Sequence, residues 1–222
     1  MEERKFVGMR KEEFGVKEFI KKEFGKGKIS GVKIEYTPVG EKVVISTHKP
    51  GLIIGKRGES IERLTEVLKK RFKMENPRVD ISEIQHPDLD AQIIADDIGL
   101  SLERFGSLRF KAIAYKALTK MKSSGALGAE IVLSGRLPSE RAKTWRFKFG
   151  YLRKTGDASN DVDYAESRGC DKQGVVGIKV SILSPEVFKS EEVNVNDELL
   201  AKLKINLNAI SEKPIKQKKA TK

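Results

Sequence analysis

The residues best suited to chemistry form a basic, glycine-rich stretch, Gly51-Leu-Ile-Ile-Gly-Lys-Arg-Gly, at positions 51–58. A phosphate-binding P-loop requires four residues between its first glycine and a Gly-Lys pair that is followed by Ser or Thr. Here three residues separate Gly51 from Gly55, and Arg57 follows the lysine, so this stretch is not a P-loop. The alternatives are an ordinary charged turn between helices and a G-x-x-G turn over residues 55–58. Two glycines let a G-x-x-G turn approach a sugar-phosphate backbone closely.

Positive charge is concentrated rather than scattered along the chain. The 222 residues include 44 Lys and Arg against 32 Asp and Glu, a formal net charge of +12. Residues 109–154 hold twelve basic and two acidic residues, a net of +10, and residues 42–58 contain no acidic residue. A solvated basic surface would give a more even distribution, so this concentration favours a nucleic acid as the partner.

Candidates for catalysis or metal binding are few. The single cysteine, Cys170, excludes an internal disulfide framework, and one Cys with two His cannot form a Cys/His zinc site. His48 and His86 are interpreted as structural or surface residues, because neither accompanies a recognisable Ser or Cys nucleophile. Asp96 and Asp97 are interpreted as part of a solvated helix face. We therefore expect no enzyme activity, no metal and no cofactor, and no apolar run is long enough to span a membrane.

The first half of the chain must position the G-x-x-G turn between two helices. Apolar residues at helical spacing predict a helix over 10–24, and alternation predicts strands at 32–36 and 43–47. An apolar stripe beginning after Gly58 predicts a helix that ends near Phe72, before a further strand at 78–83. The predicted order is helix, strand, strand, short helix, turn, helix, strand.

The second half has a different pattern, in which two helices precede four strands. The helical stripes run from Ile94 to Phe105 and from Phe110 to Met121. The strand candidates are residues 128–134, 144–151, 161–167 and 174–183. In the second of these, alternating aromatic residues are predicted to face the core, namely Trp145, Phe147, Phe149 and Tyr151. We expect the two helices to cover one face of a mainly antiparallel sheet.

Several motifs together resemble one known family. The string PGLIIGKRGESIERLTEVL resembles the core of a KH domain, and the helix and strand before it match the type II arrangement. The second half, with ISEIQHPDLDAQIIADDIGLSLE, ALGAEIVLSGRLPSERAKTW and GVVGIKVSI, is similar to the family of small-ribosomal-subunit protein three, in its archaeal and eukaryotic branch. The resemblance implies an α+β fold, in which a type II KH domain is followed by a second α+β domain.

The expected domain boundaries follow from the same resemblance. Residues 1–16 would form an N-terminal extension and the start of the first helix, and residues 17–86 the RNA-binding KH domain of type II. Residues 88–190 would form the C-terminal α+β domain of the ribosomal family, and 191–222 a mostly flexible basic tail.

The resemblance also implies a function and a set of contact residues. A member of this family is a cytoplasmic, non-enzymatic constituent of the small-subunit head that binds small-subunit ribosomal RNA and neighbouring head proteins. It also helps to form the channel by which mRNA enters and assists mRNA unwinding there. Bacterial members carry a further lysine near the position of Ala114 or Tyr115, and Lys116 is the nearest basic residue here. The RNA-binding residues expected are Lys49, Gly55, Lys56, Arg57, Gly58, Arg109, Lys111, Lys116, Arg136, Arg141, Lys143 and Arg146.

Two other functions stay open at this point. The first is a nucleic-acid-cleaving enzyme, either a nuclease or a DNA-lesion lyase; a lyase needs a lysine of depressed pKa, and the sequence singles out none. The second is a freestanding KH-domain regulator of mRNA, which the ribosomal character of the second half disfavours.

Overall fold

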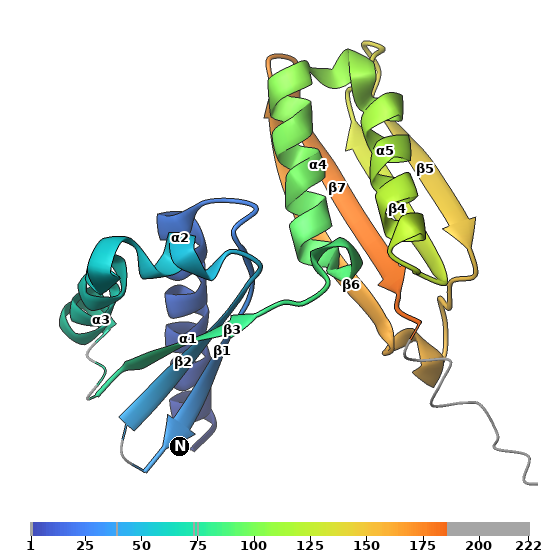
Figure 1. Cartoon of the computed structure of the whole chain (residues 1–222). Coiled ribbons are helices and arrows are strands. Elements are labelled where there is room, and N and C mark those ends of the chain that lie inside the picture. Colours follow the sequence, from blue (N-terminus) through green and yellow to red (C-terminus); the bar gives the residue numbers. More distant parts are fainter. Residues whose placement is uncertain (1, 39, 73, 75, 186–222) are drawn as a thin grey trace, which may run out of the picture. The chain divides into compact units, whose positions relative to one another are not determined.

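The computed structural model describes residues 2–38, 40–72, 74 and 76–185, which form α+β units around two separate hydrophobic cores (Figure 1). We call α1 to β3 the first domain and α4 to β7 the second domain. The predicted tail, residues 191–222, lies outside the described residues. Within the described residues, no helix combines the length and the apolar character needed to cross a membrane.

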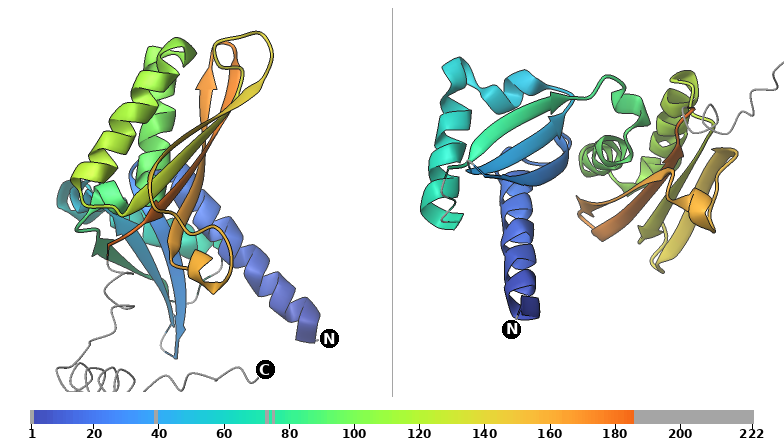
Figure 2. Two further views of the ribbon diagram at one scale, coloured as in Figure 1. Left: turned by 90° about the vertical axis from the view of Figure 1, so that its right-hand side faces the viewer. Right: turned by 90° about the horizontal axis from the view of Figure 1, so that it is seen from below.

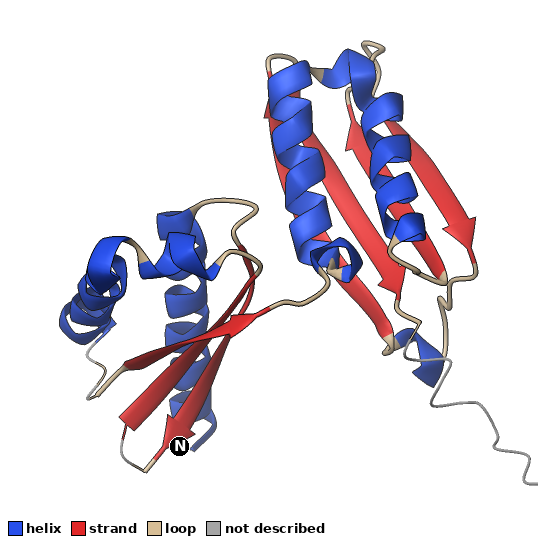
Figure 3. Ribbon diagram, viewed as in Figure 1, coloured by secondary structure: helices blue, strands red, loops and turns tan. Residues whose placement is uncertain are grey.

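The first domain packs its helices on a three-stranded sheet (Figure 3). Its elements are α1 (Glu2–Phe24), β1 (Ile29–Thr37), β2 (Gly40–Thr47), α2 (Pro50–Ile54), α3 (Glu59–Phe72) and β3 (Arg78–Glu83). The sheet order is β1-β2-β3. The β1–β2 pair is an antiparallel hairpin, whereas β2 and β3 are parallel because α2 and α3 form the crossover between them. This crossover carries the G-x-x-G turn.

The core of the first domain explains which predicted elements were accurate. Val16 and Ile20 of α1, Ile45 of β2, and Leu64 and Leu68 of α3 are all buried together. Where a helix has such a buried face, periodicity located it well. The helix predicted at 10–24 begins eight residues earlier, at Glu2. This N-terminal part extends beyond the sheet (Figure 2) and its large apolar residues are exposed, so it has no apolar stripe for periodicity to detect.

The second domain is a two-layer α/β sandwich (Figures 1 and 3). Its main elements are α4 (Ala91–Phe105), α5 (Phe110–Ser123), β4 (Gly128–Gly135), β5 (Lys143–Gly150), β6 (Val162–Asp171) and β7 (Gly174–Leu183). The sheet order is β5-β4-β7-β6 and every neighbouring pair is antiparallel. Both helices lie on one face of this sheet (Figure 2), as the sequence predicted.

Aromatic residues close the core between α5 and β5. The ring of Phe110, at the start of α5, lies 5.3 Å from the ring of Trp145 and 6.3 Å from that of Phe147. The prediction that the aromatic face of β5 packs in the core is therefore confirmed for these residues and for Phe149. It is wrong for Tyr151, which is exposed because the strand ends at Gly150 and the alternation ends with it.

A buried carboxylate corrects another prediction. Asp96 of α4 was expected on a solvated face, but it is only 7% exposed. It accepts hydrogen bonds from the backbone N–H of Gly27, from the Ser167 hydroxyl at 2.6 Å and from the Gln92 amide. Its neighbour Asp97 is exposed and pairs with Lys120, also of the second domain. Asp96 thus ties the α1–β1 loop to the second domain, a role that a helical period cannot reveal.

Candidate nucleic-acid interface

The turn over residues 55–58, which we call the GxxG loop, has a backbone that glycine makes possible. Gly55 ends α2 with φ 73°, and Gly58 has φ 86° at the start of α3. A Cβ added to Gly55 would lie 2.2 Å from the Ser60 hydroxyl oxygen, so no side chain fits there. Arg57, with φ 55°, is the only non-glycine residue with positive φ in the described part of the chain. This left-handed backbone makes the loop a tight, exposed turn.

The side chains of the GxxG loop present positive charge to solvent. Lys56 and Arg57 are exposed at the tip, and Lys49, also exposed, precedes α2. The first turn of α3 adds the carboxylates Glu59 and Glu62. Acidic side chains near a helix N-terminus interact favourably with the helix dipole, so Glu59 and Glu62 stabilise α3. They also lower the net positive charge beside the loop. The three cations remain available to phosphate oxygens.

A second basic surface lies at one end of the second domain, where α5 begins and the β4–β5 loop turns (Figure 1). Arg109 is exposed immediately before α5. Lys111 is the second residue of α5, and its ammonium lies 4.9 Å from the ring centre of Trp145. This contact places Lys111 beside β5, whose first residue is Lys143. We call this surface the basic end; it comprises Arg109, Lys111, Arg136, Arg141 and Lys143.

Two of the predicted site residues lie away from the basic end. Lys116 is exposed on α5, about two turns along from Arg109. Arg146 projects from the opposite face of the sheet, because its neighbours on β5, Trp145 and Phe147, pack toward the helices. The predicted residues therefore do not form one continuous surface. They form two groups, at the GxxG loop and at the basic end, and Lys116 and Arg146 lie apart from both.

The charge of the predicted cations is not neutralised by carboxylates. Within the described part of the chain, no ion pair joins any of the basic site residues to an acid. Other basic residues are paired: Lys154 with Glu130 at 2.6 Å and Lys179 with Glu166 at 2.9 Å. Unpaired cations keep their full charge for a polyanion. The lack of a partner permits phosphate contact without singling these residues out, because other exposed cations of the described chain have no carboxylate partner either, among them Lys11, Lys69 and Lys122.

Sequence reasoning missed two cations near the GxxG loop and one on the sheet. Arg63 follows Ser60 by three residues on α3, so helical spacing from the loop was a usable signal. Lys28 lies in the α1–β1 loop, for which no local pattern gave a position. Arg168 is exposed on β6, on the same uncovered face of the sheet as Arg146, and only the strand register reveals this.

Comparison with known proteins places this architecture in a class and then in a family. A KH domain model matches residues 15–89, and a model described as "Ribosomal protein S3, C-terminal domain" matches residues 101–182. The chain is therefore an RNA-binding type of protein, α+β throughout, with a KH domain followed by a second α+β domain.

Curated relatives identify the family. The chain is 37% identical over 199 residues to "Small ribosomal subunit protein uS3" of Methanocaldococcus jannaschii, a match that covers 89% of this chain and 95% of that protein. The protein of the same name from Methanococcus maripaludis is 33% identical, with 88% and 92% covered. That of Halobacterium salinarum is 33% identical over 82% of this chain and 60% of its own length. The chain belongs to the uS3 family of small ribosomal subunit proteins, and the relatives named here are archaeal.

Proposed function

We propose that this protein is a structural constituent of the small ribosomal subunit head, in the cytoplasm, which binds ribosomal RNA and neighbouring head proteins. The observation that carries the proposal is the pair of unpaired basic surfaces, the GxxG loop and the basic end, within one family architecture. In the GxxG loop the exposed cations are held by a fixed backbone, and at the basic end they extend from a packed core. Cations held in fixed positions can make the phosphate contacts that position RNA.

The two described lysines with a shifted pKa do not support the enzymatic alternative. An imine-forming lyase needs a lysine whose pKa is depressed. The pKa of Lys42 is raised by a hydrogen bond to Asp80, and the pKa of Lys179 is raised by a hydrogen bond to Glu166. Both shifts are opposite to the one that such a reaction requires.

Sedimentation tests the ribosomal assignment directly. We expect the tagged protein to migrate with small subunits in cell extract and to remain there after a moderate salt wash. A protein that sediments free of subunits and cleaves nucleic acid in a metal-dependent manner would contradict the proposal in favour of the enzyme.

We further propose that the basic end and Lys116 face the channel by which mRNA enters and assist unwinding. Ala substitutions at Arg109, Lys111 and Lys116 should allow subunit assembly and normal translation of unstructured messages. They should slow translation through a stable hairpin at least about tenfold, because the loss of even one charge-assisted phosphate contact removes about 1.5 kcal/mol or more. Translation kinetics on paired messages, with and without the hairpin, measure the effect.

The matched control is Lys122→Ala, in the last turn of the same helix. Equal slowing of both messages, or failure of the triple variant to assemble, would assign these residues to ribosomal RNA rather than to unwinding.

A further inference from the structure

The sheet of the second domain has one face without a helix layer. Both α4 and α5 lie on the other face (Figure 2), and within the described residues no α-helix packs on this one. Because side chains alternate along a strand, the residues next to the buried Ile131 and Leu133 on β4, and next to the buried Phe147 on β5, point to this side. We call it the uncovered face. Its charged residues are Arg146, Lys148, Arg168, Lys179, Glu130 and Glu166.

The two acids of the uncovered face are already neutralised. Glu166 pairs with Lys179 at 2.9 Å. Glu130 pairs at 2.6 Å with Lys154, which belongs to the connection between β5 and β6. The face therefore presents an excess of positive charge. Its remaining cations are exposed and have no carboxylate partner within the described part of the chain; they are Arg146, Lys148 and Arg168.

The strand register places these cations on two sides of a centre with small side chains. Arg146 lies on the edge strand β5 and Arg168 on the edge strand β6, with β4 and β7 between them. Neighbouring strands are about 4.8 Å apart, so the two edges are separated by roughly 14 Å. Gly177 of β7 lies opposite Ser134 and Arg168, and it lines a hollow of about 400 Å³ together with Lys179. The uncovered face is therefore broad and shallow, with cations along both edges.

This composition suits RNA better than it suits a protein. The core of a protein–protein interface is poor in charged residues and rich in aromatic ones. At the centre of the uncovered face the apolar side chain is the half-buried Val132, and charged side chains occupy both edges. A polyanion gains from this arrangement, because phosphate oxygens accept charge-assisted hydrogen bonds from Arg and Lys.

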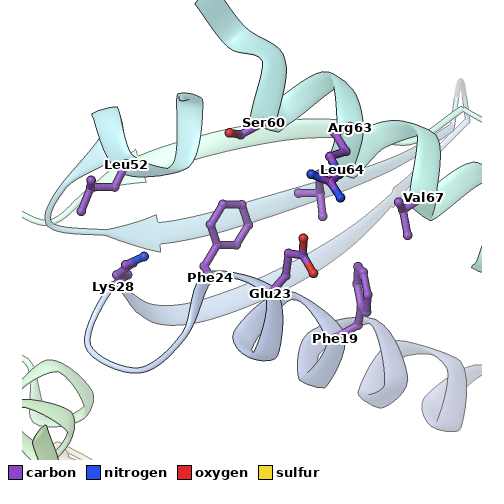
Figure 4. A pocket seen from close by; sticks show the side chains of 9 residues that line it. All are labelled: Phe19, Glu23, Phe24, Lys28, Leu52, Ser60, Arg63, Leu64 and Val67. Carbon is purple, nitrogen blue, oxygen red and sulfur yellow. The ribbon is translucent and has the colours of Figure 1, made fainter. Parts of the chain in front are cut away.

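The kind of RNA follows from the scarcity of aromatic rings. Single strands are held largely by stacking of their bases on aromatic side chains. In the first domain the rings of Phe19 and Phe24 line a pocket of about 200 Å³ (Figure 4), but Tyr164 is the one aromatic residue that β4 to β7 place on the uncovered face. Its hydroxyl donates a hydrogen bond to Glu166. An RNA double helix needs no such ring, since it is recognised by phosphate contacts across a wide, shallow minor groove.

We propose that the uncovered face binds the phosphates of a double-helical segment of RNA. The proposal rests on the proposed function, because it assumes that the protein binds RNA, and it adds a surface separate from the GxxG loop and the basic end. Arg146 and Lys148 contact one row of phosphates and Arg168 contacts the other. The small residues Ser134 and Gly177 let the groove between the two rows come close to the sheet. Arg146, which lies apart from the other predicted site residues, thereby gains a role.

Binding of an RNA duplex to the full chain tests this surface. The probes are a fluorescein-labelled blunt duplex of about 16 base pairs and one of its strands alone, both measured by fluorescence anisotropy. Arg146→Gln with Arg168→Gln should weaken duplex binding at least about tenfold, because two charge-assisted hydrogen bonds are lost. The log–log salt slope of duplex binding should fall by about two units, at about one for each phosphate contact. Binding of the single strand should change less than about twofold, because the GxxG loop and the basic end are intact.

The matched control removes the same charge from the helices. Lys11→Gln with Lys122→Gln alters α1 and α5 and should weaken duplex binding less than about twofold. All four substituted positions are exposed, so neither double variant should lower the temperature of thermal unfolding.

The outcomes separate the uncovered face from the proposed function. If neither probe binds the wild-type chain, the proposed function is wrong and this inference falls with it. If the single strand binds but duplex affinity is unchanged in Arg146→Gln with Arg168→Gln, or falls equally in the control, the inference alone is wrong. If that variant keeps its duplex affinity yet fails to enter small subunits in cell extract, the face binds a protein and the inference is likewise overturned.

Discussion

The GxxG loop and the basic end carry the same kind of charge on very different supports. At the loop, backbone geometry makes the site: Gly55 and Gly58 have positive φ, and Gly55 has no room for a side chain. At the basic end, the cations project from the ends of an ordinary helix and an ordinary strand, and packing makes the site. Lys111 is positioned by its contact with Trp145 rather than by an unusual backbone.

This difference predicts how each surface responds to substitution. A site made by backbone conformation fails when a single small side chain is added, even though no charge is lost. A site made by side chains on regular elements loses affinity in proportion to the charges removed. The following expectations test this contrast.

The largest effect is expected for Gly55→Ala. The added methyl group meets the Ser60 hydroxyl and forces a left-handed backbone on a non-glycine residue, so the free energy of unfolding should fall by about 2–3 kcal/mol. Gly58→Ala is the control, because its Cβ would meet no atom within 4 Å and only the backbone conformation would be strained. Chemical denaturation measures both variants, and equal stability losses would show that the clash with Ser60 is relieved by movement.

Charge reversal at the loop should affect RNA rather than folding. Lys56→Asp with Arg57→Asp should weaken binding of single-stranded RNA at least about tenfold at low salt, because charge-assisted hydrogen bonds are lost. Stability should change by no more than about 0.5 kcal/mol, since both side chains are exposed and Asp tolerates the left-handed backbone at position 57. Lys11→Asp with Lys69→Asp alters the net charge equally, away from the loop. Unchanged RNA affinity in a folded loop variant would contradict the assignment.

A moderate, graded effect is expected at the basic end. RNA binding should weaken with salt, and replacing Arg141 and Lys143 by Ala should reduce the log–log slope by about 1.4 units, at about 0.7 per single-strand phosphate. Arg146→Ala should leave the slope unchanged if only the basic end contacts this RNA, because Arg146 lies on the opposite face of the sheet. A double variant with the wild-type slope would show that the basic end faces away from RNA.

The smallest effect concerns the junction between the domains. The pKa of Glu103 is lowered by a backbone hydrogen bond from Cys170 and by the Lys26 ammonium at 2.9 Å. A carboxylate with a lowered pKa stabilises the fold above its ordinary pKa, near 4.5, and this contribution is lost as pH falls through the lower value. Glu103→Gln should therefore be less stable than wild type at neutral pH, and the difference should shrink in acid. A difference independent of pH in denaturation curves would show that charge is not involved.

The sequence predicted well what local patterns control. The GxxG loop was found from its glycine spacing, and the strands and helices with a buried face were placed within a few residues. Asp96 could not be placed, since its burial depends on Gly27 and Ser167, which are distant in the chain. Lys111 is exposed, and its contact with the Trp145 ring likewise depends on a residue distant in the chain. Tertiary contacts decide these positions, and a single sequence does not encode them in a local period.

Crosslinking in assembled small subunits tests most directly the claim that two separate basic surfaces hold RNA. Photoreactive groups are placed at position 56 in the loop and at position 141 in the basic end, with position 11 on α1 as the control. The account predicts that positions 56 and 141 each crosslink to RNA, at distinct sites, well above position 11. Crosslinks from 56 and 141 that go only to proteins, or that do not exceed the control, would contradict it.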